Sequence, residues 1–199
     1  EGTAAPAALA FTAANWGVPQ TVTVTGADDP VDDGDVAYTI TLAAPVSVDP
    51  IYAAIDPADV AAVNADDDAA GVDVTPVTGL GTTEAGGGAS FTVVLNSQPT
   101  ADVVIPVASS DATEGTVSTS NLTFTAADWN VAQTVTVTGV NDAVDDGDVA
   151  YAVLVGAAAS ADPKYASLDA TDVGVTNVDD DGAGITVAPL AGLATTEAG

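Results

Sequence analysis

The chain has 199 residues, in which 29 acidic residues stand against one basic residue, Lys164, and no histidine, so the formal net charge is -28. Binding to phosphate depends on Lys and Arg, so nucleic acids are excluded as partners, and anionic membrane surfaces likewise. So many acids cannot be paired within the chain, and the compact state therefore needs cations from solution.

The composition also bounds the class of protein. Hydrophobic residues make up 47% of the chain and fall in short β-branched runs, so a core can form despite the charge. No run approaches the roughly 18 apolar residues of a membrane-spanning helix. Cysteine is absent, which removes disulfides and thiol chemistry. The first residues do not resemble a signal peptide, so any export signal is expected outside this sequence.

An internal repeat with a period of 113 residues organises the chain. The stretch 1–86 reappears as 114–199 without insertion or deletion, and 50 of the 86 positions are identical. A period of this length is that of a domain and not of one coil of a solenoid. Since an Asp triplet closes each copy, we predict three parts in chain order. Residues 1–68 are the C-terminal part of one β-sandwich repeat, 69–181 are a complete repeat, and 182–199 are the opening strand and turn of the next.

Seven β-strands are predicted within the complete repeat, because β-branched residues alternate there with a period of two. In chain order the runs are 71–76, 89–95, 102–108, 121–125, 133–139, 148–155 and 172–177. Seven short strands in about 100 residues, separated by turn residues, are typical of an all-β, immunoglobulin-like sandwich. Pro106 within the third run predicts an edge strand or a bulge at that point.

The acids of the complete repeat gather in loops at one end of this sandwich. Successive strands run up and down, so successive loops fall at alternate ends. One end receives three acids, Asp128, Asp162 and Asp169. The other end receives ten, which are Glu84, Asp111, Glu114, Asp142, Asp145, Asp146, Asp148, Asp179, Asp180 and Asp181. Two carboxylates about 4 Å apart repel by roughly 4 kcal/mol at an effective dielectric near 20, so such a cluster opposes folding unless cations bridge it.

Calcium is the cation expected at this cluster. Ca²⁺ takes about 6 to 8 oxygen ligands in a flexible geometry, whereas Mg²⁺ demands a stricter octahedron. Transition metals are disfavoured because His and Cys are missing. The repeat predicts further ligands in the neighbouring copies, namely Glu1, Asp28, Asp29, Asp32, Asp33, Asp35, Asp66, Asp67, Asp68 and Glu197. The alternative is that these acids are solvated turn residues, as the pair Asp146-Gly147 is common in turns.

Trp129 and its copy Trp16 lie in a loop at the opposite end. A tryptophan there either closes the core of the sandwich or offers a platform for a ligand. The solvent exposure of Trp129 distinguishes these two interpretations.

Three features of the complete repeat, Thr82-Thr83-Glu84-Ala85-Gly86, the Asp-rich turn in its middle and the terminal Asp triplet, give it a family resemblance. Over its whole length it resembles the calcium-binding Calx-beta type of immunoglobulin-like domain. This resemblance implies calcium at one tip, held by an early Glu, by acids of middle loops and by a terminal acidic run. The implied ligands are Glu84, Asp111 or Glu114, Asp142 with Asp145 and Asp146, and Asp179 to Asp181. The near-identical copies also resemble the repeats of giant bacterial surface adhesins and filament proteins.

These observations predict a structural, calcium-stiffened repeat of an extracellular or cell-surface fibre or adhesin. Its expected partners are neighbouring repeats of the same chain and identical chains in a filament. A calcium-dependent module that binds glycans is the alternative. An enzyme is not expected, because no nucleophile-and-base arrangement is present. A glycosidase using two carboxylates is the third hypothesis, and the lack of a cleft-forming insertion argues against it.

Overall fold

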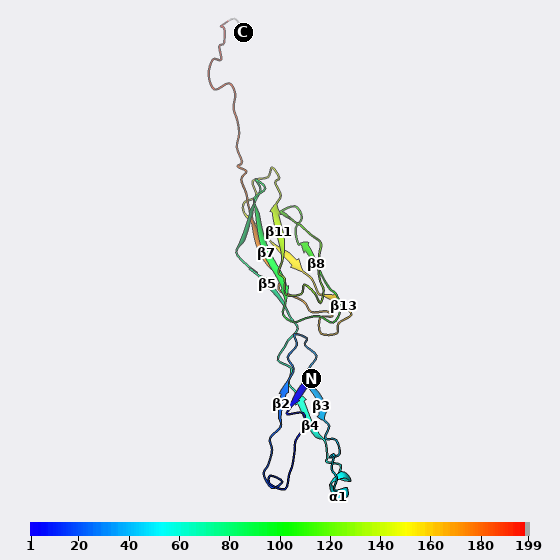
Figure 1. Ribbon diagram of the computed structural model, residues 1–199. Coiled ribbons are helices and arrows are strands. Elements are labelled where there is room, and N and C mark those ends of the chain that lie inside the picture. Colours follow the sequence, from blue (N-terminus) through cyan, green and yellow to red (C-terminus); the bar gives the residue numbers. More distant parts are fainter. Residues whose placement is uncertain (198–199) are drawn as a thin grey trace.

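A computed structural model describes residues 1–197 and shows an elongated molecule (Figure 1). A larger β-structure contains β5 to β14, and a smaller one contains β1 to β4 and the short helix α1 (Pro50–Ala53). The N-terminus lies where the two meet, and an extended segment leads from β14 to the far end. No helix within residues 1–197 has the length and apolar character that crossing a bilayer requires.

The larger structure is a sandwich of two sheets. The first has the order β5-β7-β11-β9, from strands Val72–Thr75, Gly88–Leu95, Gln133–Gly139 and Gly115–Val117. The second has the order β10-β8-β12-β14-β6, from strands Asn121–Phe124, Val103–Ser109, Val149–Val155, Val173–Val178 and Leu80–Thr83. The short β13 (Ala159–Ser160) also pairs with β8. All pairs are antiparallel except β14 with β6, which run parallel.

Alternation along the strands builds the core between the sheets. In β7 the inward side chains Phe91, Val93 and Leu95 are buried, and the residues between them are not. They pack in one cluster with inward residues of the second sheet, such as Ile105 and Phe124. Full burial of each such side chain is worth about 1.5–3 kcal/mol, so this alternation fixes which face of each strand points inward.

The prediction of an all-β sandwich is confirmed, and all seven predicted runs form strands whose ends differ from the predicted ones by at most one residue. The structure adds three short strands, β6, β9 and β13. The Leu-Gly-Thr-Thr sequence of β6 and the two or three residues of the others are too short to show an alternating pattern. They form because longer strands beside them supply backbone partners.

Pro106 lies opposite a β-bulge and not on an edge strand. Strand β8 has neighbours on both sides, with β10 on one and β12 followed by β13 on the other. Val155 faces Val107 and Ala159 faces Val104, so residues 156–158 stand opposite only 105 and 106. One extra residue in this register is a bulge, which removes the need for an N–H at the proline.

Residues 1–68 form two separate hairpins. Strand β1 (Gly2–Ala5) pairs with β2 (Thr23–Gly26), and β3 (Val36–Ile40) pairs with β4 (Val60–Asn64). Both registers recur 113 positions later, in β9 with β11 and in β12 with β14. Residues 182–197, where an opening strand was expected, form no strand. The equivalent β5 pairs with β7, and the structure places no such strand beside 182–197.

Candidate metal centre

Six carboxylates converge at the end of the sandwich from which the C-terminal segment leaves. They come from the loop after β6, the turn before β9, the loop between β11 and β12, and the residues after β14. Three groups have ligand atoms within 4.8 Å of one another: Glu84, Asp146 and Asp179; Glu84, Asp142 and Asp181; and Glu114, Asp142 and Asp146. Since the groups share members, they form one cluster, called the distal cluster below.

Glu84 is the residue around which this cluster is built. Its side chain is only 3% exposed, and its Oε2 atom has no hydrogen-bond partner. Burial raises the pKa of Glu84, and the charges of Asp179 and Asp142 raise it further. A buried, unpaired carboxylate oxygen costs folding free energy unless a cation or proton meets it. The cluster offers only oxygen ligands, several of them charged, which fits a hard divalent cation.

The other predicted ligands of this end divide into two kinds. Asp181 belongs to the cluster, and desolvation together with the charges of Asp179 and Asp180 raises its pKa. Asp180 is exposed and belongs to none of the three groups. Asp111 instead accepts hydrogen bonds from the hydroxyl and N–H of Thr113, which lower its pKa. Of the alternatives Asp111 and Glu114, only Glu114 lies in the cluster.

A hydrogen-bonded framework holds the Asp triplet in place. The N–H of Gly147 donates to Asp179 Oδ2 over 2.8 Å, and the N–H of Asp181 donates to Asp179 Oδ1 over 2.8 Å. Gly147 has a φ of 76°, in the left-handed region that glycine adopts without strain. Asp148 accepts from the N–H of Asp179, so it positions the triplet without joining the three groups. Asp145 likewise accepts from the N–H of Ala183 over 2.6 Å.

Asn177 is a site residue that the sequence analysis missed. It is buried at the end of β14, and its Nδ2 donates to Glu114 Oε2 over 3.3 Å and to the carbonyl of Val140 over 3.1 Å. The hydroxyl of Thr82 donates to Asn177 Oδ1 over 2.9 Å. Asn177 therefore ties β6, β14 and the loop after β11 together beneath the acids. Its recurrence as Asn64, just before the first Asp triplet, was the available signal.

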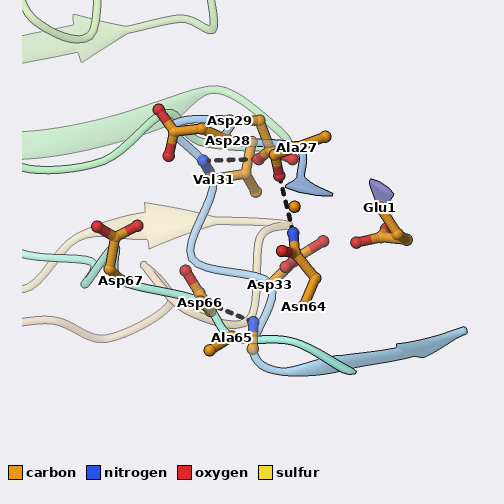
Figure 2. Close-up of a pocket in the computed structure, with 12 residues that line it drawn as sticks. Glu1, Ala27, Asp28, Asp29, Val31, Asp33, Asn64, Ala65, Asp66 and Asp67 are labelled. Atoms are coloured by element: carbon orange, nitrogen blue, oxygen red, sulfur yellow. Dashed lines mark hydrogen bonds between the residues drawn. The ribbon is translucent and has the colours of Figure 1, made fainter. Parts of the chain in front are cut away.

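A second acidic cluster, called the junction cluster below, lies in residues 1–68 where the two β-structures meet. It surrounds a cavity of about 210 Å³, and the acids among its lining residues are Glu1, Asp28, Asp29, Asp33, Asp66 and Asp67. Figure 2 shows these acids approaching from the chain start, the loop after β2 and the residues after β4. Asp28, Asp67 and Asp68 bring ligand atoms within 4.8 Å of one another. Desolvation and neighbouring carboxylates raise the pKa of Asp33 and of Asp68.

The framework of the junction cluster repeats that of the distal cluster. Gly34 donates to Asp66 over 2.6 Å, and the N–H of Asp66 donates to Asp35 over 3.0 Å. Asn64 donates to the carbonyl of Ala27 over 2.8 Å. Each bond has a counterpart 113 positions later. Among residues 1–197, no buried glutamate like Glu84 lines the cavity of the junction cluster.

The single basic residue of the chain lies beside the junction cluster. Lys164, in a loop of the sandwich, forms an ion pair with Asp32, and this contact lowers the pKa of Asp32. Asp32 also accepts from the N–H of Ala70 over 2.9 Å, and Gln98 N–H donates to the carbonyl of Pro30 over 2.7 Å. The acidic end of residues 1–68 therefore contacts the less acidic end of the sandwich.

Two further predicted residues lie apart from these clusters. Glu197 is exposed in the C-terminal segment and belongs to none of the groups of acids found in residues 1–197. Trp129 is half-buried and packs against the core, and its carbonyl accepts from the N–H of Leu95. This placement favours the interpretation of Trp129 as a residue that closes the core.

Comparisons with known proteins give no family and only weak structural matches. No family model and no curated protein matches the sequence. Among solved structures, the apo form of the Calx CBD1 domain is 18% identical over 55% of this chain and 96% of that chain, with a TM-score of 0.41. The periplasmic chaperone SfaE is 12% identical over 60% and 61%, with a TM-score of 0.43. Domains 4 and 5 of the S-layer protein SbsC are 18% identical over 61% and 52%, with a TM-score of 0.31.

The chain thus spans less than two thirds of the chaperone and about half of the S-layer fragment. Since these three TM-scores are all below 0.5, the matches carry no conclusion about this chain and transfer no function.

Proposed function

We propose that the chain is a stretch of tandem, 113-residue, Calx-beta-type repeats that bind calcium and act as structural spacers in an extracellular or cell-surface fibre. The observation that carries the proposal is Glu84, a buried carboxylate with an unpaired oxygen among acids that have no cationic side chain beside them. The one lysine of the chain lies at the other end of the sandwich, against Asp32.

Calcium at the distal cluster would join the beginning of the domain to its end. Glu84 follows β6, which opens the second sheet, and Asp179 and Asp181 follow β14, which closes it. Asp142 and Asp146 add the loop between β11 and β12. Since Glu84 has no hydrogen bond to give up at Oε2, a cation there meets no competing partner.

Calcium at the junction cluster would act on the connection between the two β-structures. Only residues 65–71 separate β4 from β5, and they include the Asp triplet of the junction cluster. Fixing the backbone of this triplet restricts the hinge, whereas repelling carboxylates beside Gly71 loosen it. Stiffening of the array is the function we assign to the ions.

Thermal unfolding with calcium and with chelator tests this proposal, with magnesium as the matched control. A ligand bound only by the native state stabilises it by about 4 kcal/mol at 1,000 times its dissociation constant. We expect a clear rise of the melting temperature in calcium and a smaller one in magnesium. An unchanged midpoint in calcium at low ionic strength would falsify the calcium proposal.

A further inference from the structure

The inner faces of residues 1–68 expose side chains whose counterparts in the sandwich are buried. Phe11 is 56% exposed, whereas Phe124 is 0% exposed, and Tyr52 is 55% exposed, whereas Tyr165 is 1% exposed. The same contrast separates Leu9, Val24 and Val60 from Leu122, Val137 and Val173. Apolar surface gathered on one face and left in water marks a place where another segment packs.

Strands β5 to β8 cover the equivalent face in the sandwich. Phe91 and Val93 of β7 and Ile105 of β8 pack in the same core cluster as Phe124 and Tyr165. Their backbones pair there as well: β7 with β11, β8 with β10 and β12, and β6 with β14. In residues 1–68 the matching edges of β2, β3 and β4 have no such neighbours. Residues 8–11, which correspond to β10, form no strand.

We propose that residues 1–68 are an acceptor for a polypeptide segment with the sequence pattern of residues 69–113. The chain itself contains such a segment, because residues 69–113 pack on residues 114–181. The stretch 114–181 is identical to 1–68 at 39 of 68 positions. A β7-like strand pairs with β2, a β8-like strand pairs with β3, and a β6-like strand pairs with β4 in parallel. The inference rests on the repeat architecture of the proposed function and not on calcium.

The same segment completes the junction cluster. In the sandwich, β6 carries Glu84 to the acids after β14. A β6-like strand on β4 carries its glutamate to Asp29, Asp33 and Asp66, the counterparts of Asp142, Asp146 and Asp179. Acceptor and segment are both acidic, so their association is opposed by charge and strengthened by salt or by a bridging cation.

A peptide of residues 69–113, which contains no tryptophan, is the probe. It is added to the full chain carrying Trp129→Phe, so that Trp16 is the one tryptophan reporter. We expect saturable binding of one peptide per chain, with a blue shift of Trp16 emission, in chelator and in calcium. A peptide with Phe91→Asp and Val93→Asp is the matched control, with binding weaker by about tenfold or more.

Binding of the peptide both in chelator and in calcium supports the acceptor. Equal affinity in the two conditions also supports the acceptor, and it counts against calcium at the junction cluster. Equal binding by the control peptide, or no saturable binding in either arm, overturns it. Self-association of the chain that the peptide does not compete with assigns the face to a second copy instead. If the peptide is insoluble, a longer chain with residues 69–113 placed directly before Glu1 gives the same test. There Trp16 must become as protected as Trp129, and continued exposure contradicts the inference.

Discussion

Glu84 is expected to have opposite effects with and without a cation. In chelator its buried charge is unpaired and repelled by Asp179 and Asp142, which together with burial raise its pKa. Neutralising it relieves this cost but removes a charged ligand. We therefore expect Glu84→Gln to raise the melting temperature in chelator and to weaken calcium binding by about tenfold or more.

The matched control is Glu197→Gln, because Glu197 has the same local sequence as Glu84 but is exposed in the C-terminal segment. It should change neither quantity. Loss of stability in chelator on Glu84→Gln, with unchanged calcium affinity by calorimetry, would show that the residue is not a ligand.

Asp162 is expected to stabilise the opposite end of the sandwich in a pH-dependent way. Burial acts to raise its pKa, but hydrogen bonds from the N–H groups of Thr100 and Lys164 outweigh it, and its pKa lies below 3.8. A lowered pKa means that the stabilisation is present above pH 3.8 and is lost as the pH falls through the folded-state value.

Asp162→Asn should therefore cost about 1–3 kcal/mol at neutral pH, because Asn accepts through one oxygen only and leaves one of these two partly buried N–H groups unpaired. The difference in free energy of unfolding between the variant and the original chain should become smaller below pH 3.8, as measured by denaturant unfolding. Asp169→Asn, at an exposed position of the same loop, should show neither effect. If this difference does not depend on pH, the lost stability comes from packing and not from the charge of Asp162.

Among the connecting elements, the loop that carries Lys164 joins the two β-structures through the ion pair of Lys164 with Asp32. The counterpart of Lys164 in the preceding copy is Ile51, so Lys164→Ile keeps a residue that the repeat tolerates. Since Lys164 is 46% exposed, solvent screens its ion pair and the melting temperature should hardly change. The mobility between the two β-structures should rise, as read from NMR relaxation, and Lys164→Arg should restore the original behaviour. Equal mobility in all three chains would show that this ion pair does not orient the two β-structures.

The elements also show what the sequence could and could not predict. Strands with three or more alternating core residues, such as β7 and β12, were predictable because burial selects their pattern. Strand β6 was not, since its place depends on a parallel partner almost a hundred positions away. The gathering of the acids at one end was predictable from the order of the loops. Which of Asp111 and Glu114 joins the cluster was not predictable, because a hydrogen bond from Thr113 holds Asp111 within its own turn.

At the scale of the whole molecule, the position of the junction cluster predicts a change of shape. An array of three or more repeats should scatter as a rod in millimolar calcium and as a flexible string in chelator. The reason is that the proposed ions would fix the Asp triplets beside each short connection. Small-angle scattering measures both the maximum dimension and the flexibility. Identical profiles in the two conditions would reject the stiffening role even where calorimetry shows that calcium binds.

The parallel pairing of β6 with β14 also determines how the molecule bears a pulling force. The chain enters the sandwich at the end that contacts residues 1–68 and leaves it at the opposite end (Figure 1). A pull on both sides therefore drags β6 and β14 in opposite directions along their common axis. Their evenly spaced hydrogen bonds are then loaded in shear all at once, and not opened one after another. Glu84 and Asp179 follow these same two strands. A cation bound between them would therefore resist the sliding of β6 along β14, and with it the mechanical unfolding of the sandwich.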